Sequence, residues 1–92
     1  MLESAIEKSS MAAAKKAGWW AIKLVPSFIA GLPDRMFIGH GKVVFIEYKT
    51  EKGKLTKLQV AVHKRFEKHG IAVYVCRSKE ETMLVLNKYE TS

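Results

Sequence analysis

The hydrophobic residues of this chain follow two patterns, one with the spacing of an α-helix and one with the short apolar runs of β-strands. Leu58, Val62 and Phe66 recur every four residues, on one face of a helix. Residues 43–46 are all apolar, as in a strand covered on both faces of a sheet, and Pro26 is expected to end an earlier strand. The predicted elements are a helix at 2–17, strands at 19–25, 35–39 and 42–49, a helix at 55–68, a strand at 71–76 and a last helix from 78 to about 89.

Polar residues that begin or end helices support these boundaries. Thr56 and Gln59 fit a capping box at the start of the second helix, and Gly70 fits a C-cap at its end. Ser78 and Glu81 have the same capping-box spacing before the last helix. The second and last helices therefore each have a local reason to begin where the apolar periodicity begins.

The order of the elements predicts an α/β fold with the arrangement αβββαβα. Strands 35–39 and 42–49 form a hairpin and must be antiparallel. The second of them continues through helix 55–68 to strand 71–76, a crossover that is expected to be right-handed and to make the two strands parallel. The result is a mixed four-stranded sheet flanked by helices. Ninety-two residues are enough for one such domain, spanning 1–92.

Two acidic residues flank the hairpin and are expected to face each other. If the turn closes on His40 and Gly41, Asp34 lies opposite Glu47, whereas a bulge at the turn would shift the pairing by one residue. Like charges directly opposite on antiparallel strands are destabilising. Lys49 follows Glu47 by two residues and therefore points to the same face. This arrangement indicates a site for a cation and makes a metal-dependent phosphodiesterase the first hypothesis.

The charge and composition of the chain limit its partners. The formal net charge is +7, which favours a polyanion such as nucleic acid. No apolar run approaches the roughly 20 residues that span a bilayer, so no membrane partner is expected. Cys76 is the single cysteine and lies in an apolar run, where we expect a buried strand residue. A reducing cytoplasm fits these features.

The motifs around the two acids resemble a known nuclease family. Pro33-Asp34 and Glu47-Tyr48-Lys49 match the two parts of the PD-(D/E)xK motif. With Gly31 and Gln59, they resemble the virus-type replication-repair nuclease (VRR-NUC) family of the PD-(D/E)xK superfamily, and the resemblance covers nearly the whole chain. It implies a restriction-endonuclease-like core and a metal-dependent endodeoxyribonuclease.

The chemistry of phosphodiester hydrolysis explains the residue types. A divalent metal stabilises charge on the phosphate and produces hydroxide near neutral pH. Asp34 and Glu47 are expected to hold Mg²⁺ or Mn²⁺, and Lys49 to hydrogen-bond the attacking water or the phosphate. The resemblance further implies that the backbone carbonyl of Tyr48 binds the metal and that Glu3 reaches it, often through water in the family, with Glu7 as the alternative. It also implies a catalytic supporting role for Gln59, beside the site and near the lysine or the phosphate.

The same resemblance implies a partner and a cellular setting. Lysines after the catalytic strand and on the first strand are expected to contact DNA phosphates, namely Lys52, Lys54, Lys57 and Lys23. Stand-alone members of the family are homodimers that place two active sites on branched DNA. By analogy we expect a homodimer acting on four-way (Holliday) junctions in replication, repair or recombination, in the cytoplasm of a bacterium or of a phage host.

Two other functions compete with this one. A catalytically inactive nucleic-acid-binding module of the same fold would keep the basic surface but would have no reason to keep Asp34 and Glu47 opposed. A small basic RNA-binding protein would explain the charge and not the acids. His40 lies at the hairpin tip, too far away for a general base, and His63 and His69 lack partners at the spacing of a zinc site.

Overall fold

The computed structural model describes residues 1–25 and 29–90, and the predicted order αβββαβα is confirmed. The elements are α1 (Glu3–Lys16), β1 (Trp20–Lys23), β2 (Arg35–Gly39), β3 (Lys42–Tyr48), α2 (Lys57–Lys68), β4 (Val73–Cys76) and α3 (Lys79–Glu90). Pro26, where we expected the first strand to end, lies outside the described residues.

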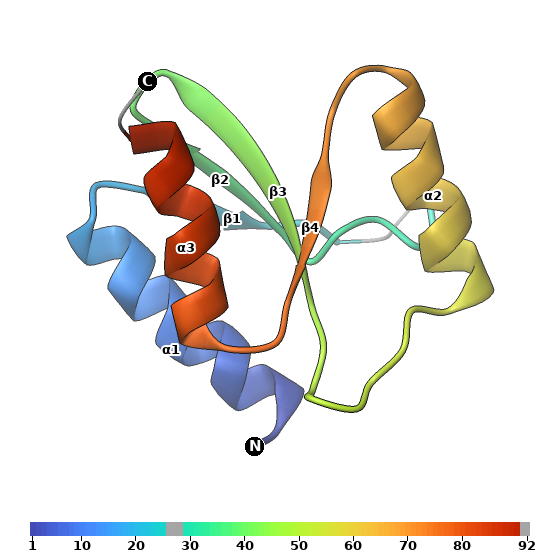
Figure 1. The fold of residues 1–92 in the computed structure, drawn as a ribbon, viewed down its shortest axis with the longest axis horizontal. Helices are drawn as coiled ribbons and strands as arrows, with labels where there is room; N and C mark the ends of the chain where they lie inside the picture. The colour runs from blue at the N-terminus through green and yellow to red at the C-terminus, as the bar shows by residue number, and fades with distance from the viewer. Residues whose placement is uncertain (26–28, 91–92) are drawn as a thin grey trace.

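The four strands form one sheet in the order β1-β2-β3-β4. The first two pairings are antiparallel and the pairing of β3 with β4 is parallel, as the crossover through α2 predicts. Figure 1 shows α1 and α3 on one side of this mixed sheet and α2 on the other. The start of α1 lies beside the end of β3, so the first helix approaches the strand end that carries the acids (Figure 1).

The hairpin turn between β2 and β3 has the even length that the opposition of Asp34 and Glu47 requires. His40 and Gly41 both have positive φ, 52° and 73°, as in the two-residue turns that match the twist of a hairpin. No bulge shifts the register, because Arg35 pairs with Ile46 along the same ladder. The next pair outward would join Asp34 to Glu47.

The hydrophobic core lies between the sheet and the pair of helices α1 and α3. Alternate residues of β3, Val44, Ile46 and Tyr48, face this side and are buried. Trp19 is buried there too, whereas the adjacent Trp20 is exposed, as expected for neighbours on opposite faces. The remaining core residues are Ile6, Ala14, Phe37, Cys76, Val85 and Leu86, so the expected burial of the cysteine is confirmed.

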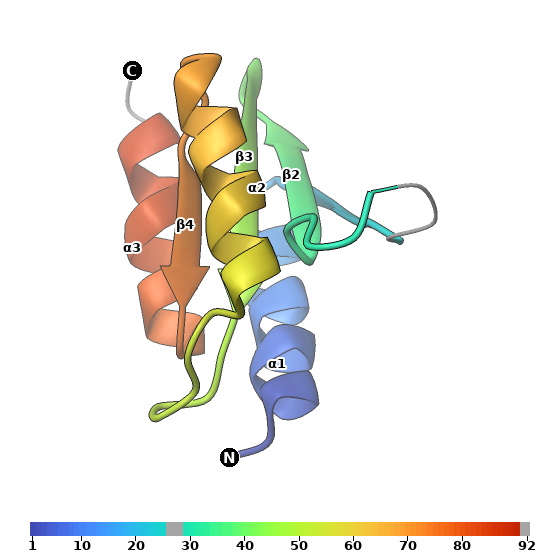
Figure 2. The ribbon, with the colours of Figure 1, turned by 90° about the vertical axis from the view of Figure 1, so that its right-hand side faces the viewer.

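The opposite face of the sheet is covered only in part. The rings of Phe45 and Phe66 meet edge to face with centroids 5.0 Å apart, which packs α2 onto β3. Figure 2 shows α2 in front of β3 and β4, with β2 beside it. Val43, near the hairpin tip, is half exposed. The expectation that residues 43–46 are covered on both faces is therefore wrong at Val43, because α2 does not extend over that end of β3.

Several predicted boundaries shift by one or two residues. The capping box of Thr56 and Gln59 is present with both hydrogen bonds, and α2 begins after it at Lys57 instead of at 55. At α3, Ser78 accepts the bond from the Glu81 backbone, but the Glu81 carboxylate accepts from the backbone of Arg77 and not from that of Ser78. In the described part of the chain, no helix is long and apolar enough to span a membrane.

Candidate active site

Tyr48 anchors the end of β3 and thereby orients its two neighbours. Its side chain is buried against the helices, where its hydroxyl lies 3.1 Å from Thr82 Oγ1. The Thr82 hydroxyl in turn donates to Ser10 of α1 over 3.0 Å. Burial raises the pKa of Tyr48 to about 12, so the hydroxyl stays protonated. Because side chains alternate along a strand, Glu47 and Lys49 point to the opposite face, toward α2.

Asp34 lies at the point where the chain joins β2 and is fixed by backbone on both sides. Its own carbonyl accepts the Leu24 N–H over 3.0 Å, which continues the pairing with β1. Its Oδ2 accepts the Tyr48 N–H over 2.7 Å. The carboxylate thus takes the place of a ladder hydrogen bond just past the last pair of β2 and β3. This contact holds Asp34 beside the Glu47 end of β3.

Gly31 lets the loop before Asp34 approach α2 closely. Its φ is +86°, a conformation that L side chains rarely adopt, and a Cβ atom there would lie 3.0 Å from the carbonyl oxygen of Leu58. Leu58 directly precedes Gln59 on α2. The glycine of the family motif therefore packs the Asp34 loop against the helix that supplies Gln59.

Glu47 is the most buried charged group of the site, with only 1% of its side chain exposed. Its Oε2 accepts a hydrogen bond from Gln59 Nε2 over 3.2 Å, while its Oε1 is buried without a hydrogen-bond partner among the described residues. Burial, then the hydrogen bond with Asp34 and the Asp34 charge, raise the pKa of Glu47 to about 8. The hairpin register and the contact of Asp34 with the Tyr48 backbone place the two carboxyl groups at the same end of β3.

Lys49 supplies the positive charge that the motif predicts on this face. Its backbone N–H donates to the Cys76 carbonyl over 3.2 Å, which extends the parallel pairing one residue past β3. The side chain is only 9% exposed. Its charge acts to lower the pKa of Glu47, against the larger effects of burial and Asp34. Lys49 therefore faces the same small volume as the two acids.

Gln59 has both of the roles between which the sequence left a choice. Its Oε1 accepts the Thr56 N–H over 2.9 Å in the capping box, and its Nε2 donates to Glu47. A side-chain amide carries an acceptor and a donor, so one residue can serve both contacts. The first turn of α2 is thus tied directly to β3, the strand that carries Glu47.

His63 belongs to this cluster and was missed in the sequence analysis. It is buried, and its Nε2 lies 3.5 Å from Glu47 Oε1. Burial is the main cause that lowers its pKa, which favours the neutral ring. The signal was its position four residues after Gln59, one turn along the same helical face. The spacing of zinc ligands does not reveal this position, because the partner of His63 is Glu47 on β3.

Glu3 and Glu7 occupy different surroundings. Glu7 Oε2 lies 2.5 Å from Arg35 Nε and 3.8 Å from Lys23 Nζ, so it is engaged on the far side of β2. Glu3 is exposed in the first turn of α1, and its charge is among the causes that raise the pKa of Glu47. Of the two candidates, Glu7 is engaged with Arg35, and Glu3 is the one whose charge acts on Glu47.

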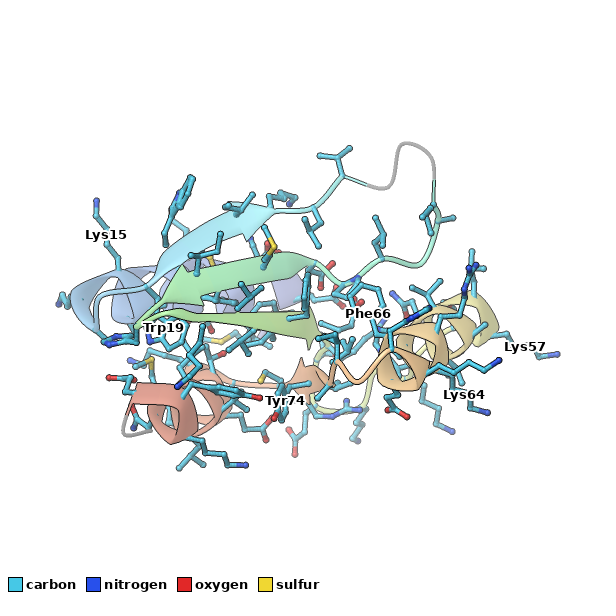
Figure 3. All side chains as sticks on the ribbon, turned by 90° about the horizontal axis from the view of Figure 1, so that it is seen from above. Lys15, Trp19, Lys57, Lys64, Phe66 and Tyr74 are labelled. Carbon is cyan, nitrogen blue, oxygen red and sulfur yellow. The ribbon has the colours of Figure 1, made fainter. Side chains whose placement is uncertain are left out.

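The lysines predicted to contact DNA lie on the loop after β3 and at the start of α2. Lys52, Lys54 and Lys57 are all exposed, and Lys57 points away from the sheet (Figure 3). Arg77 Nη1 holds this loop by donating to the carbonyls of Thr50, over 2.7 Å, and Gly53, over 2.6 Å. Lys23 is also exposed, but it lies on β1 beside Glu7.

The donor set suits a hard divalent cation. Asp34 and Glu47 bring two carboxyl groups together, and the Oε1 atom of Glu47 is a buried acceptor that no described residue satisfies. In the described ranges, no group of three or more His, Cys, Asp or Glu side chains is placed to hold a metal. Two carboxylates supplemented by backbone oxygen and water are the kind of set that Mg²⁺ uses, whereas zinc prefers nitrogen and sulfur.

Comparisons with known proteins agree with this geometry. A family model described as the VRR-NUC domain matches residues 6–80. A phage protein named "Putative nuclease p44", from Acyrthosiphon pisum secondary endosymbiont phage 1, is 34% identical over 79 residues, which cover 85% of each chain. A solved structure described as a VRR_NUC domain has a TM-score of 0.83 and 28% identity, covering 95% of this chain and 96% of the other. The restriction-endonuclease-like core is thereby confirmed.

Proposed function

The chain belongs to the VRR-NUC domain family of nucleases, and on that premise we propose that it is a metal-dependent endodeoxyribonuclease. The observation that carries the proposal is the buried Glu47 carboxyl group, which lies close to the Asp34 carboxyl group and whose Oε1 has no hydrogen-bond partner among the described residues. A protein gains nothing in stability from such a pair without a cation, because burial and like charge both disfavour the ionised form.

Asp34 and Glu47 would hold Mg²⁺ or Mn²⁺, with the backbone carbonyl of Tyr48 as a further oxygen. When bound, such a cation supplies charge stabilisation at the phosphate and a more acidic water. Lys49 contributes a buried ammonium that hydrogen-bonds the attacking water or a phosphate oxygen. Glu3 is exposed at the rim of the site, where a water molecule can join it to the cation.

DNA is the proposed substrate, held by phosphate contacts. The exposed residues Lys52, Lys54 and Lys57 follow the strand that carries Glu47 and Lys49. A DNA strand whose phosphates contact these lysines would therefore lie next to the carboxyl groups of Asp34 and Glu47. Such contacts position DNA without reading its sequence and weaken steeply as salt is added. Branched DNA, four-way junctions above all, is proposed from the family resemblance, with a homodimer presenting two sites. The phage relative suits action in the cytoplasm of a bacterial host.

Cleavage of labelled DNA tests this function. Purified protein is incubated with duplex, flap and four-way junction DNA in Mg²⁺, in Mn²⁺ or in EDTA. We expect cleavage only with metal, fastest on the junction. Asp34→Asn and Lys49→Met should each lower the rate about 100-fold or more, since the first removes a metal ligand and the second removes the ammonium that acts on the water or the phosphate. Glu80→Gln, an equally small change on the exposed surface of α3, should cut at the wild-type rate.

The results of this assay also separate the competing functions. Cleavage that persists in EDTA, or Asp34→Asn cutting as fast as wild type, would contradict the proposal. Salt-sensitive DNA binding without any cutting would favour the inactive binding module. Binding of RNA in preference to every DNA substrate would favour the RNA-binding alternative.

A further inference from the structure

The face of α2 that meets the catalytic strand presents two polar side chains to one carboxyl group. Gln59 and His63 are four residues apart, about 6 Å along the helix and on the same side of it. Gln59 Nε2 donates to Glu47 Oε2 over 3.2 Å, and His63 Nε2 lies 3.5 Å from Glu47 Oε1. Each oxygen of Glu47 thus faces its own nitrogen from the same helix.

The contact between His63 and Glu47 is nearly, but not fully, a hydrogen bond. Both His63 Nε2 and Glu47 Oε1 are buried and lack any hydrogen-bond partner in the described part of the chain. A buried polar atom without a hydrogen-bond partner costs free energy of folding. Two such atoms that face each other are therefore expected to have a functional role. A shift of about 0.5 Å would bring the pair within the usual 2.7–3.2 Å range of a hydrogen bond.

We propose that His63 is a positioning residue that, together with Gln59, fixes both oxygens of the Glu47 carboxylate in the orientation that receives the divalent cation. With its proton on Nε2, His63 donates to Oε1, and each carboxylate oxygen keeps a second lone pair for the cation. Packing of Phe66 onto Phe45 seats this part of α2 on β3, so the two donors arrive with the helix as one rigid unit. The inference rests on the proposed metal-dependent function.

Hydrogen-bond partners of a ligating carboxylate typically change metal affinity 10–100-fold when they are removed. The test is calorimetric titration of Mn²⁺ into the metal-free protein without DNA, which does not depend on catalysis. His63→Leu keeps the bulk of the ring and removes the donor, and it should weaken Mn²⁺ binding about 10-fold or more. His63→Gln places an amide nitrogen near the position of Nε2 and should restore most of the affinity.

His69→Leu is the matched control, because the same substitution is made at an exposed histidine that caps the end of α2. It should bind Mn²⁺ like the wild type. Melting temperatures in EDTA check that every variant is folded. Should His63→Leu not fold, His63→Asn replaces it, since its shorter amide falls back from Oε1 and should bind Mn²⁺ more weakly than His63→Gln.

Wild-type affinity in His63→Leu would overturn the inference, and so would equal losses in His63→Leu and His63→Gln, which would indicate a packing role only. These outcomes leave the proposed function intact if the wild-type protein still binds Mn²⁺ and cuts DNA. A wild-type protein that binds Mn²⁺ without cutting DNA would contradict the proposed nuclease function, and the variants would still test the positioning role of His63. A wild-type protein that binds no divalent cation would overturn both.

Discussion

At the scale of single residues, the site is organised around one buried carboxyl group. Glu47 is held by Gln59, faced by His63 and pressed against Asp34, while Lys49 opposes the accumulated negative charge. Its pKa of about 8, against an ordinary value of 4.5, means that the metal-free protein keeps Glu47 protonated near neutral pH. A proton and the proposed cation would therefore compete for the same carboxyl group.

This competition predicts how stability depends on pH. Between pH 4.5 and 8 the folded protein keeps a proton that the unfolded chain has released, so the free energy of unfolding of the metal-free protein falls as pH rises. The pKa of His63 is lowered from its ordinary 6.5, so this group makes the free energy of unfolding rise with pH, but only below pH 6.5. Urea unfolding in EDTA between pH 6.5 and 8 should show the decline, and Glu47→Gln should abolish it.

Glu80→Gln, an exposed surface change, should keep the wild-type decline. Saturating Mn²⁺ should also flatten the curve for the wild type, because the bound cation compensates the ionised carboxylate. A wild-type protein whose stability does not change over this range in EDTA would show that Glu47 is not perturbed as its surroundings indicate.

The motif predicted Asp34, Glu47, Lys49 and Gln59 correctly as neighbours, because the hairpin register and the capping box are local features of the sequence. The role of His63 could not be predicted in the same way. Its contact with Glu47 depends on how α2 packs across β3, which follows from tertiary contacts and not from spacing along the chain. Whether Glu3 or Glu7 faces the site was open for the same reason.

Among the elements of the fold, the loop between β3 and α2 leads from the strand that carries Glu47 and Lys49 to the exposed lysines proposed to contact DNA. It carries Lys52 and Lys54, and Arg77 clamps it through the carbonyls of Thr50 and Gly53. Arg77 directly follows β4, the parallel neighbour of β3. The crossover that defines the fold therefore also brings the residue that shapes the basic loop, a link that no local motif in the sequence indicated.

Removing the Arg77 hydrogen bonds to this loop should lower the stability of the protein. Arg77→Met should lower the free energy of unfolding by about 2 kcal/mol or more, since even one hydrogen bond to a charged donor contributes roughly 1.5–3 kcal/mol and Arg77 makes at least two. Arg77→Lys should lose nearly as much, because a single ammonium lacks the planar fork of the guanidinium. Urea unfolding measures the stability of both Arg77 variants. The control is Lys79→Met, a substitution at a half-exposed neighbour. Changes below about 0.5 kcal/mol in both variants would contradict the clamp.

At the scale of the whole molecule, one part of the sheet remains uncovered. Trp20, Ile38 and Val43 lie side by side across β1, β2 and β3 on the face that α2 only partly covers. Trp20 is 66% exposed and Val43 is 50% exposed. A row of large apolar side chains across a sheet favours contact with another protein surface, and the proposed homodimer would cover it.

Sedimentation velocity tests this surface. The wild-type protein should sediment at twice the chain mass of 10.4 kDa. The double variant Trp20→Lys with Val43→Lys should sediment as a monomer, because two buried charges without partners oppose association. Leu84→Lys is the control, since Leu84 is an equally exposed apolar residue on α3, across the sheet. A monomeric wild type, or dissociation by Leu84→Lys alone, would contradict a dimer through this face.

The proposed function depends on one divalent cation that Asp34 and Glu47 hold together at the end of the hairpin. The most direct measurement is anomalous scattering from a crystal of the protein soaked in Mn²⁺. We expect one strong anomalous peak within bonding distance of both carboxyl groups, at about 2 Å, and its loss in Asp34→Asn. A peak bound by other residues, or no peak while both carboxyl groups remain accessible and unligated, would contradict it.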